Sequence, residues 1–224
     1  MTESPETFAQ HLATRFEGLI HSSTAAHGQV TLELSAANLL AVGAALRDED
    51  EFAFAQLSDL CGVDYSQYGQ ADWETQDTTS TGFSRGVSEG VYHQPEAGAQ
   101  HLAVVYHLLS IKHNRRLRLR CRLNNDPPRI PSIITLWASA DWYEREAFDL
   151  YGILFEGHPD LRRLLTDYGF IGHPFRKDFP LEGNVEVRYD PDQQRVIYQP
   201  VTITNRVLVP KVIREDDRYT NNEK

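Results

Sequence analysis

The sequence predicts an α+β fold, a mixed sheet covered by helices, followed by a docking segment and an extended C-terminal tail. Apolar residues at helical spacing alternate with strand-like stretches in the first half of the chain. The strict two-residue alternation of RRLRLRCRLN is typical of a sheet strand. Short β-like pieces broken by prolines follow residue 183 and indicate a tail that lies on a neighbour. We expect an α+β domain at 1–140 with a long loop at 66–100, a docking segment at 141–182 and a tail at 183–224.

The first elements are expected in the order helix, strand, helix, strand. Apolar spacing predicts a helix over residues 6–20 that closes near His21 and Ser22. QVTLELS alternates as a strand, and SAANLLAVGAALRDED predicts a second helix with Ser35 as its N-cap. EFAFAQLSDLCGVDY is expected to start as a strand with Phe52 and Phe54 on one face.

A hairpin completes the predicted sheet. Residues 66–100 are rich in Gly, Ser, Thr, Gln and Asp without periodicity, which predicts a long loop. HLAVVYHLLSI then predicts a strand, and KHNR predicts a turn in which Asn114 takes a positive φ. The next strand alternates, so its arginines share one face of a sheet whose other face is covered by helices. These arginines are Arg116, Arg118, Arg120 and Arg122.

The stretch SIITLWASADWYEREAFDLYGI predicts a short apolar segment and then a helix. Asp141 and Glu144 have the spacing of a capping box, and Gly152 suits the position that follows the C-cap. The polar side of this helix is expected to consist of Glu144, Arg145, Glu146 and Asp149.

Composition excludes several classes of protein. The net charge of -10 argues against a protein that coats nucleic acid. No stretch approaches the roughly 20 apolar residues of a membrane span, and MTESPETFAQ lacks the features of a secretory signal. Cys61 and Cys121 form no C-x-x-C pair, which fits a reducing compartment and argues against an iron–sulfur cluster or structural zinc held by this chain alone.

The arginine row allows two interpretations. One is an RNA-binding face that contacts phosphates. The other is a solvated or protein-covered face with the arginines paired to carboxylates, which is favoured because aromatic residues are missing from the strand and the whole chain is acidic.

Two Gly-His-Pro triplets, at 157–159 and 172–174, are each followed by a basic pair. Their histidines are fifteen residues apart and lack the H-x-x-x-H spacing of a local zinc site. The chain has no phosphate-binding glycine motif and no G-x-S-x-G elbow. Glu144 and Glu146 point in different directions on a helix. We therefore expect no catalytic, cofactor-binding or metal site, and the aromatic and arginine content suits a rigid docking segment.

The stretch EREAFDLYGILFEGHPDLRRLL resembles the signature of the 30 kDa subunit family of the proton-pumping NADH:quinone oxidoreductase, respiratory complex I. YHLLSIKHNRRLRLRCRL and TDYGFIGHPFRKDFPLEG also look like this family, so the resemblance covers roughly 30–65 and 100–185. The signature positions are filled by Glu144, Arg145, Glu146, Asp149, Leu150, Tyr151, His158, Arg162, Leu164 and Leu165.

This resemblance implies a peripheral-arm component of a quinone-reducing translocase that carries no cofactor of its own. NADH, FMN, the iron–sulfur clusters and quinone would belong to other subunits. The implied partners are the large quinone-site subunit and the adjacent iron–sulfur subunits, without nucleic acid. The implied location is the cytoplasmic face of the bacterial inner membrane, with membrane association only through partners. The implied role is assembly and positioning of the quinone-site subunit.

The interface is expected to involve charged residues of the docking segment. They are Glu144, Arg145, Glu146, Asp149, His158, Arg162, Arg163, His173, Arg176 and Lys177. Two alternatives stay open: a homologous subunit of a membrane-bound hydrogenase or ferredoxin-linked quinone reductase, and a free-standing RNA-binding protein that uses the arginine row.

Overall fold

The computed structural model describes residues 4–68, 73–75, 87–89, 101–123 and 127–203. The chain divides into two compact units. The first unit comprises residues 1–66 and 97–181, and the second comprises residues 67–96 and 182–224.

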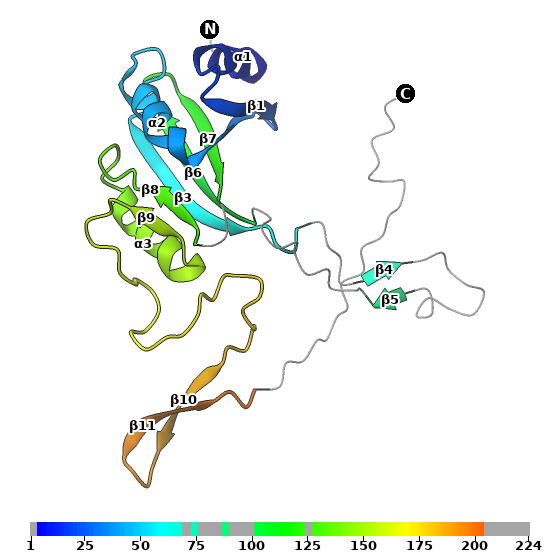
Figure 1. Cartoon of the computed structure of the whole chain (residues 1–224), viewed down its shortest axis with the longest axis vertical. Helices are drawn as coiled ribbons and strands as arrows, with labels where there is room; N and C mark the ends of the chain where they lie inside the picture. The colour runs from blue at the N-terminus through cyan, green and yellow to red at the C-terminus, as the bar shows by residue number, and fades with distance from the viewer. Residues whose placement is uncertain (1–3, 69–72, 76–86, 90–100, 124–126, 204–224) are drawn as a thin grey trace, which may run out of the picture. The chain divides into compact units, whose positions relative to one another are not determined.

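The first unit is an α+β domain built on a five-stranded mixed sheet (Figure 1). The strand order is β1-β2-β7-β6-β3, with β2 and β7 parallel and the other neighbours antiparallel. Its elements are α1 (Pro5–Arg15), β1 (Ile20–Ala26), β2 (Gln29–Leu34), the 3-10 helix η1 (Ala36–Asn38), α2 (Leu39–Asp48), β3 (Gln56–Asp64), β6 (Leu102–Ser110), β7 (Arg115–Arg122), β8 (Arg129–Pro131), α3 (Ala140–Tyr151) and β9 (Leu154–Glu156). Short strands β8 and β9 pair in parallel beside α3.

The register of the sheet places its apolar side chains in rows. Leu32, Leu119, Tyr106 and Leu60 are successive neighbours across β2, β7, β6 and β3, and all are almost fully buried. Apolar residues of α1, α2 and α3 belong to the same core. This burial of apolar surface against the helices is the main favourable term in folding. The predicted α+β class with helices on the sheet is confirmed.

The first helix is shorter than predicted. It begins after Ser4, whose hydroxyl accepts from the Thr7 N–H at 3.2 Å, and it ends at Arg15 instead of continuing to residue 20. Gly18 takes a φ of 77° and turns the chain directly into β1, which the sequence did not predict.

The second helix and the strand after it also differ in detail. Ser35 precedes the 3-10 turn η1 and makes no side-chain capping bond. The expected strand at Phe52 and Phe54 is wrong, because these residues form a tight turn and the strand starts only at Gln56. The Phe54 N–H donates to the Leu46 carbonyl of α2 at 2.9 Å. Both phenylalanine rings are buried and contact the ring of Phe8 in α1.

The predicted hairpin of β6 and β7 is confirmed. Asn114 has a φ of 51° in the turn, and the side chains of β7 alternate between buried apolar residues and more exposed arginines. On the arginine face, Arg120 forms an ion pair with Glu33 on β2, while Arg118 donates to the Gln29 side chain at 2.9 Å. Pairing with β2 therefore occupies the middle of the arginine row.

The edge of the sheet at β3 is covered by side chains that precede or begin α3. Trp137 Nε1 donates to the Phe54 carbonyl at 3.0 Å, next to the strand. Tyr143 Oη donates to the Ser58 carbonyl within β3 at 3.2 Å. Gly62 lets α3 approach, since a Cβ there would lie 2.5 Å from the Tyr151 ring. These contacts fix α3 against β3.

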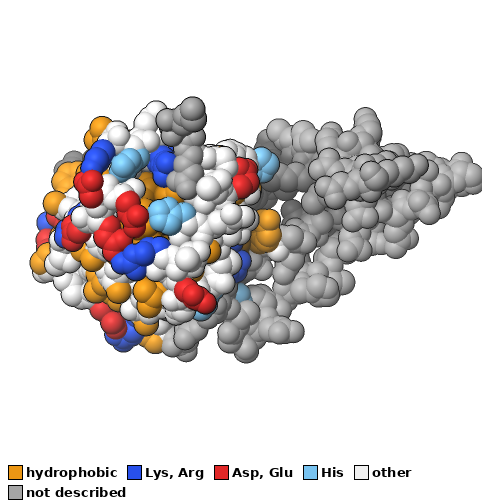
Figure 2. Space-filling view, turned by 90° about the horizontal axis from the view of Figure 1, so that it is seen from above, with side chains coloured by type: hydrophobic (Ala, Val, Ile, Leu, Met, Phe, Trp, Pro, Cys, Tyr) orange, Lys and Arg blue, Asp and Glu red, His pale blue; other side chains and the backbone are white. Residues whose placement is uncertain are grey.

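Charges of both signs are interspersed on the face shown in Figure 2. In the first unit, Arg15 pairs with Glu49, and Lys112 pairs with Asp50. Exposed pairs of this kind contribute little to stability. The described part of this face thus carries charges of both signs rather than a patch of one sign.

The second unit contains two short antiparallel pairs. Strand β4 (Trp73–Thr75) pairs with β5 (Val87–Glu89), and β10 (Val185–Asp190) pairs with β11 (Arg195–Pro200). The rest of the predicted loop at 66–100 lies mostly outside the described residues, as does the tail from 204 onward. The β-like pieces predicted after residue 183 are found as the hairpin of β10 and β11.

Candidate functional site

The predicted capping box at the start of α3 is wrong. The helix begins at Ala140, and the Glu144 carboxylate turns toward the segment that precedes the helix. It accepts from Ser132 Oγ at 2.6 Å and from the Ile133 N–H at 2.8 Å, and its side chain is fully buried. Burial raises the pKa of Glu144 above its usual value, although these two donors oppose the shift. Glu144 thus fastens α3 to the preceding loop.

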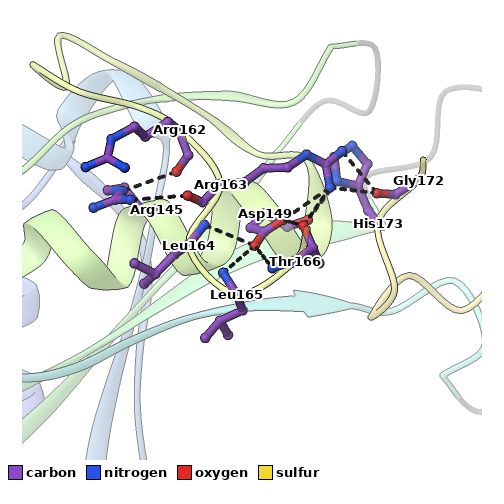
Figure 3. A network of polar contacts seen from close by, with 9 residues as sticks. All are labelled: Arg145, Asp149, Arg162, Arg163, Leu164, Leu165, Thr166, Gly172 and His173. Carbon is purple, nitrogen blue, oxygen red and sulfur yellow. Dashed lines mark hydrogen bonds and ion pairs between the residues drawn. The ribbon is translucent and has the colours of Figure 1, made fainter. Parts of the chain in front are cut away.

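Asp149 is the centre of the polar network in Figure 3. Its Oδ2 accepts from the N–H groups of three successive residues, Leu164, Leu165 and Thr166, at 3.1, 2.8 and 2.8 Å. Its Oδ1 accepts from the Thr166 hydroxyl and from Arg163 Nη1, the latter at 3.2 Å. The side chain of Asp149 is fully buried. One carboxylate therefore shapes the whole turn at 163–166.

These donors stabilise the ionised form of Asp149. Burial alone would raise its pKa, but the hydrogen bonds from Thr166, Leu165 and Leu164 outweigh burial and lower it. Arg163 extends the network, because its guanidinium also donates to the Gly172 carbonyl at 3.4 Å. The turn at 163–166 is thereby joined to the second Gly-His-Pro triplet.

That second triplet closes the C-terminal end of α3. Gly152 has a φ of 74°, and its N–H donates to the Phe148 carbonyl at 2.8 Å. The next three carbonyls of the last turn, which have no partners inside a helix, accept from the following segment. The Asp149 carbonyl accepts from His173 Nδ1 at 2.9 Å, so Nδ1 carries the ring proton. The carbonyls of Leu150 and Tyr151 accept from the Phe175 N–H at 3.1 Å and from Arg176 Nε at 2.6 Å.

The first triplet serves the N-terminal part of the same helix. His158 is enclosed: its Nδ1 accepts from the Asp160 N–H at 3.1 Å, and its Nε2 lies 3.2 Å from the Asp141 carbonyl. Since a carbonyl only accepts, Nε2 carries the proton. Gly157 and Gly172 have φ values of 86° and 102°, in the left-handed region that glycine adopts without steric cost. The two triplets hold the two ends of α3.

The polar side predicted for α3 is not a solvent-facing side. Glu144 and Asp149 are fully buried, Arg145 is 6% exposed, and Glu146 is partly buried. Arg145 donates to the carbonyls of Arg162 and Arg163, both at 3.2 Å (Figure 3). The helix therefore lies between β3 and the loop at 157–176, and two residues of its predicted polar side, Arg145 and Asp149, hold that loop.

Four large apolar side chains of the loop are exposed. Leu165 is 62% exposed, and in Figure 3 its side chain points away from the Asp149 carboxylate. Tyr168, Ile171 and Phe175 are 99%, 78% and 55% exposed. We call the exposed side chains of Leu165, Tyr168, Ile171 and Phe175 the docking surface. A rigid loop with polar anchors inside and large apolar residues outside has the character of an interaction site.

The structure gathers most of the predicted site residues around α3 but separates a few. Arg162 is exposed beside Asp160, with Nε 2.8 Å from Oδ2. Lys177 lies where its backbone N–H donates to Asp64 Oδ2 at 2.8 Å. Sequence reasoning missed Ser132 and Thr166, whose hydroxyls complete the bonds to Glu144 and Asp149. Neither residue stands in a recognisable motif, so no sequence signal identified them.

Many contacts of the network are made to backbone groups of this chain. Its carboxylates accept from N–H and hydroxyl groups of this chain, and its cations donate to carbonyls and carboxylates. The described residues contain no group of three or more His, Cys, Asp and Glu side chains that could hold a metal ion. Within the same residues, no helix combines the length and apolar character needed to cross a bilayer.

Comparison with known proteins supplies the decisive observation. Residues 32–185 match the family model of the respiratory-chain NADH dehydrogenase 30 kDa subunit. The chain belongs to this family. A relative from Coxiella burnetii (strain Dugway 5J108-111), named as a subunit of NADH-quinone oxidoreductase, is 57% identical over 220 residues, covering 98% of this chain and 97% of the relative. A relative of the same name from Legionella pneumophila (strain Paris) is 56% identical over 218 residues. The alignment covers 97% of this chain and 96% of the relative.

A solved structure of low sequence identity shares the fold. A chain of a membrane-bound sulfane sulfur reductase, an archaeal respiratory membrane complex, matches with a TM-score of 0.55 over 79% of this chain and 85% of that chain. At 17% identity, this likeness shows the fold alone. A trypsin-resistant fragment of Nqo5 is 26% identical with a TM-score of 0.44, over 70% of this chain and 98% of the fragment. The predicted resemblance to the 30 kDa subunit family of complex I is confirmed by the family match.

Proposed function

We propose that this chain is a peripheral-arm subunit of NADH:quinone oxidoreductase that supports assembly and positions the quinone-site subunit. Family membership over residues 32–185 supports the first part of this proposal. The loop at 157–176 supports the second part, because its polar groups face α3 while its docking surface stays exposed. That combination is the observation that carries the proposal.

Preorganisation is the physical reason for this interpretation. Ordering a loop on binding costs conformational entropy, and a loop already held in place avoids most of that cost. Asp149 holds the turn at 163–166 through backbone N–H groups, and the side chain of Leu165 stays exposed. Leu165 and Ile171 are thus free to bury apolar area against a partner, which is how exposed apolar patches on subunits act.

The ten charged residues of the predicted interface would contribute in two ways. Arg162 and Lys177 are exposed and would meet acidic groups of a partner directly. The other eight are at least partly buried and would act indirectly, by holding the shape of the docking segment. They are Glu144, Arg145, Glu146, Asp149, His158, Arg163, His173 and Arg176.

The proposed partners are the large quinone-site subunit and the adjacent iron–sulfur subunits. In this scheme NADH, FMN, the iron–sulfur clusters and quinone are bound by other subunits, and this chain moves no electrons. It would lie peripherally at the cytoplasmic face of the inner membrane and reach the membrane only through its partners. Curated relatives named as subunits of NADH-quinone oxidoreductase support this assignment.

Paired substitutions on the docking surface test the proposal. Leu165→Ser and Ile171→Ser remove exposed apolar side chains, so the isolated chain should keep its stability while assembly weakens. Truncating a hot-spot residue of an interface costs about 2–4 kcal/mol of binding free energy, which is roughly thirtyfold or more in affinity. Ile111→Ser is the matched control, since Ile111 is 69% exposed in the turn between β6 and β7.

Native gels and NADH:quinone activity of membranes from cells that carry only the variant chain are the measurements. The two docking-surface variants should reduce the assembled complex and the activity together, while the Ile111 control stays normal. Arg162→Glu should act in the same direction, because Arg162 is exposed and pairs only with nearby Asp160 among the described residues. Full assembly with Leu165→Ser and Ile171→Ser combined would refute the docking surface.

A further inference from the structure

A second candidate site lies in the first unit, at the end of the arginine row. A cavity of about 520 Å³ opens beside β2 and β7, within the size range of small-ligand pockets. Its polar lining consists mainly of Arg120, Arg122, Arg129, Glu33 and His21. It shares no residue with the docking surface.

Charge in this cavity is positive. The lining contains three arginines and one carboxylate, that of Glu33, which forms an ion pair with Arg120. Burial would raise the pKa of Glu33, but the hydrogen bond and charge of Arg120 outweigh burial and lower it, so Glu33 stays ionised and committed to Arg120. Arg122 and Arg129 are therefore left to supply the net positive charge.

Among the described residues, neither of these two arginines forms a buried ion pair with an acid. Arg122 is exposed, with its guanidinium 4.8 Å from the centre of the Tyr65 ring. Arg129 lies 3.4 Å from Glu156, with both side chains more than half exposed, and such exposed pairs contribute little. In addition, the buried Nε–H of Arg120 has no acceptor among the described residues. Buried donors of this kind are normally satisfied by protein, water or an ion.

We propose that this cavity is a binding site for a carboxylate. The guanidinium group presents a planar fork of N–H donors that matches the two oxygens of a carboxylate. Arg122 and Arg129 supply two such forks around one cavity, in a chain whose overall charge of -10 would otherwise repel anions. The carboxylate has two possible sources: a free organic acid, or an acidic side chain of a neighbouring subunit.

Arginine footprinting on the full chain tests the site. Phenylglyoxal modifies accessible guanidinium groups, and mass spectrometry of the digest gives the rate at each arginine. Malonate should slow modification of Arg122 and Arg129, whereas sodium chloride at equal ionic strength should not. Arg116 is the internal control, because it is exposed on the same face of β7 but outside this cavity. Arg122→Gln should weaken malonate protection at Arg129 about tenfold, the loss expected for one charge-assisted contact.

The same measurement on the assembled complex distinguishes the two sources, and this arm alone rests on the proposed function. If Arg122 and Arg129 are protected from phenylglyoxal in the complex without malonate, an acidic side chain of a neighbour occupies the site. Reactive arginines that malonate protects in the complex indicate a free carboxylate. If malonate protects these two arginines in the isolated chain no better than chloride does, or protects Arg116 equally, the carboxylate site is refuted.

Discussion

Replacing Asp149 by asparagine isolates the charge that shapes the docking segment. The side chain keeps its size, so the change leaves no cavity. If the amide oxygen takes the place of Oδ2, it keeps the three N–H donors at 164–166 but without a charge. The amide NH₂ then takes the place of Oδ1 and opposes Arg163 Nη1, which lies 3.2 Å from Oδ1. The amide NH₂ and the Arg163 guanidinium, both donors, then face each other where Arg163 had donated to Oδ1.

The magnitude follows from these bonds. Hydrogen bonds to charged groups contribute about 1.5–3 kcal/mol against about 1 kcal/mol for neutral ones, and removing one partner of a buried ion pair costs about 3–5 kcal/mol. The Arg163 side chain is a quarter exposed, so water can solvate its guanidinium once the ion pair is lost. This solvation offsets part of the cost of breaking the pair. We expect Asp149→Asn to lower the free energy of unfolding by about 2–4 kcal/mol.

Urea unfolding followed by circular dichroism measures the change, and Asp160→Asn is the control. Asp160 pairs with Arg162 on the surface, so its replacement should have little measurable effect. The folded pKa of Asp149 is lowered, so its stabilisation is present above the ordinary aspartate pKa of about 3.9 and is lost as the pH falls through the folded value. The gap between wild type and variant should therefore narrow below about pH 4. Equal effects of the two substitutions, or a gap independent of pH, would refute this reasoning.

Two further predictions concern backbone and thiol positions. Gly152→Ala should destabilise the chain more than Gly157→Ala: both glycines have positive φ, but only at 152 would a Cβ meet other atoms, 2.6 Å from His173 Nε2 and 2.7 Å from Arg176 Nη2. The positive φ costs alanine about 1 kcal/mol of stability at either position. Thermal unfolding should show a further loss of stability for the substitution at 152, and equal losses for the two variants would contradict the close approach. Burial raises the pKa of Cys121 to about 12, so a disulfide reagent at pH 8 should label Cys121 only in urea, and rapid labelling of the folded chain would contradict its burial.

Features decided by near neighbours were predictable from the sequence. The alternation of apolar residues and arginines in β7 determines which of its side chains enter the core. Asn114 adopts the positive φ that the turn before β7 requires. Gly152 ends α3 in the left-handed conformation, as its place after the last apolar residues predicted. Each of these depends on a few consecutive residues, so the local pattern is sufficient.

Features decided by distant segments were not predictable. Glu144 stands three residues after Asp141, but its carboxylate binds Ser132 and Ile133, which precede the helix. A helical wheel could not show that the charged side of α3 is covered by a loop from later in the chain. Strand β1 was missed because IHSSTAA is an edge strand with little apolar alternation.

The residues that cover β3 also have a consequence for the chain before it meets its partners. An edge strand offers unpaired backbone groups to any other strand, and this is a common route to aggregation. Here Trp137 and Tyr143 donate to the carbonyls of Phe54 and Ser58, and Ser139 Oγ donates to the Leu57 carbonyl at 3.4 Å. A newly synthesised copy therefore presents no open template along the start of β3 and can wait for the rest of the complex without polymerising there.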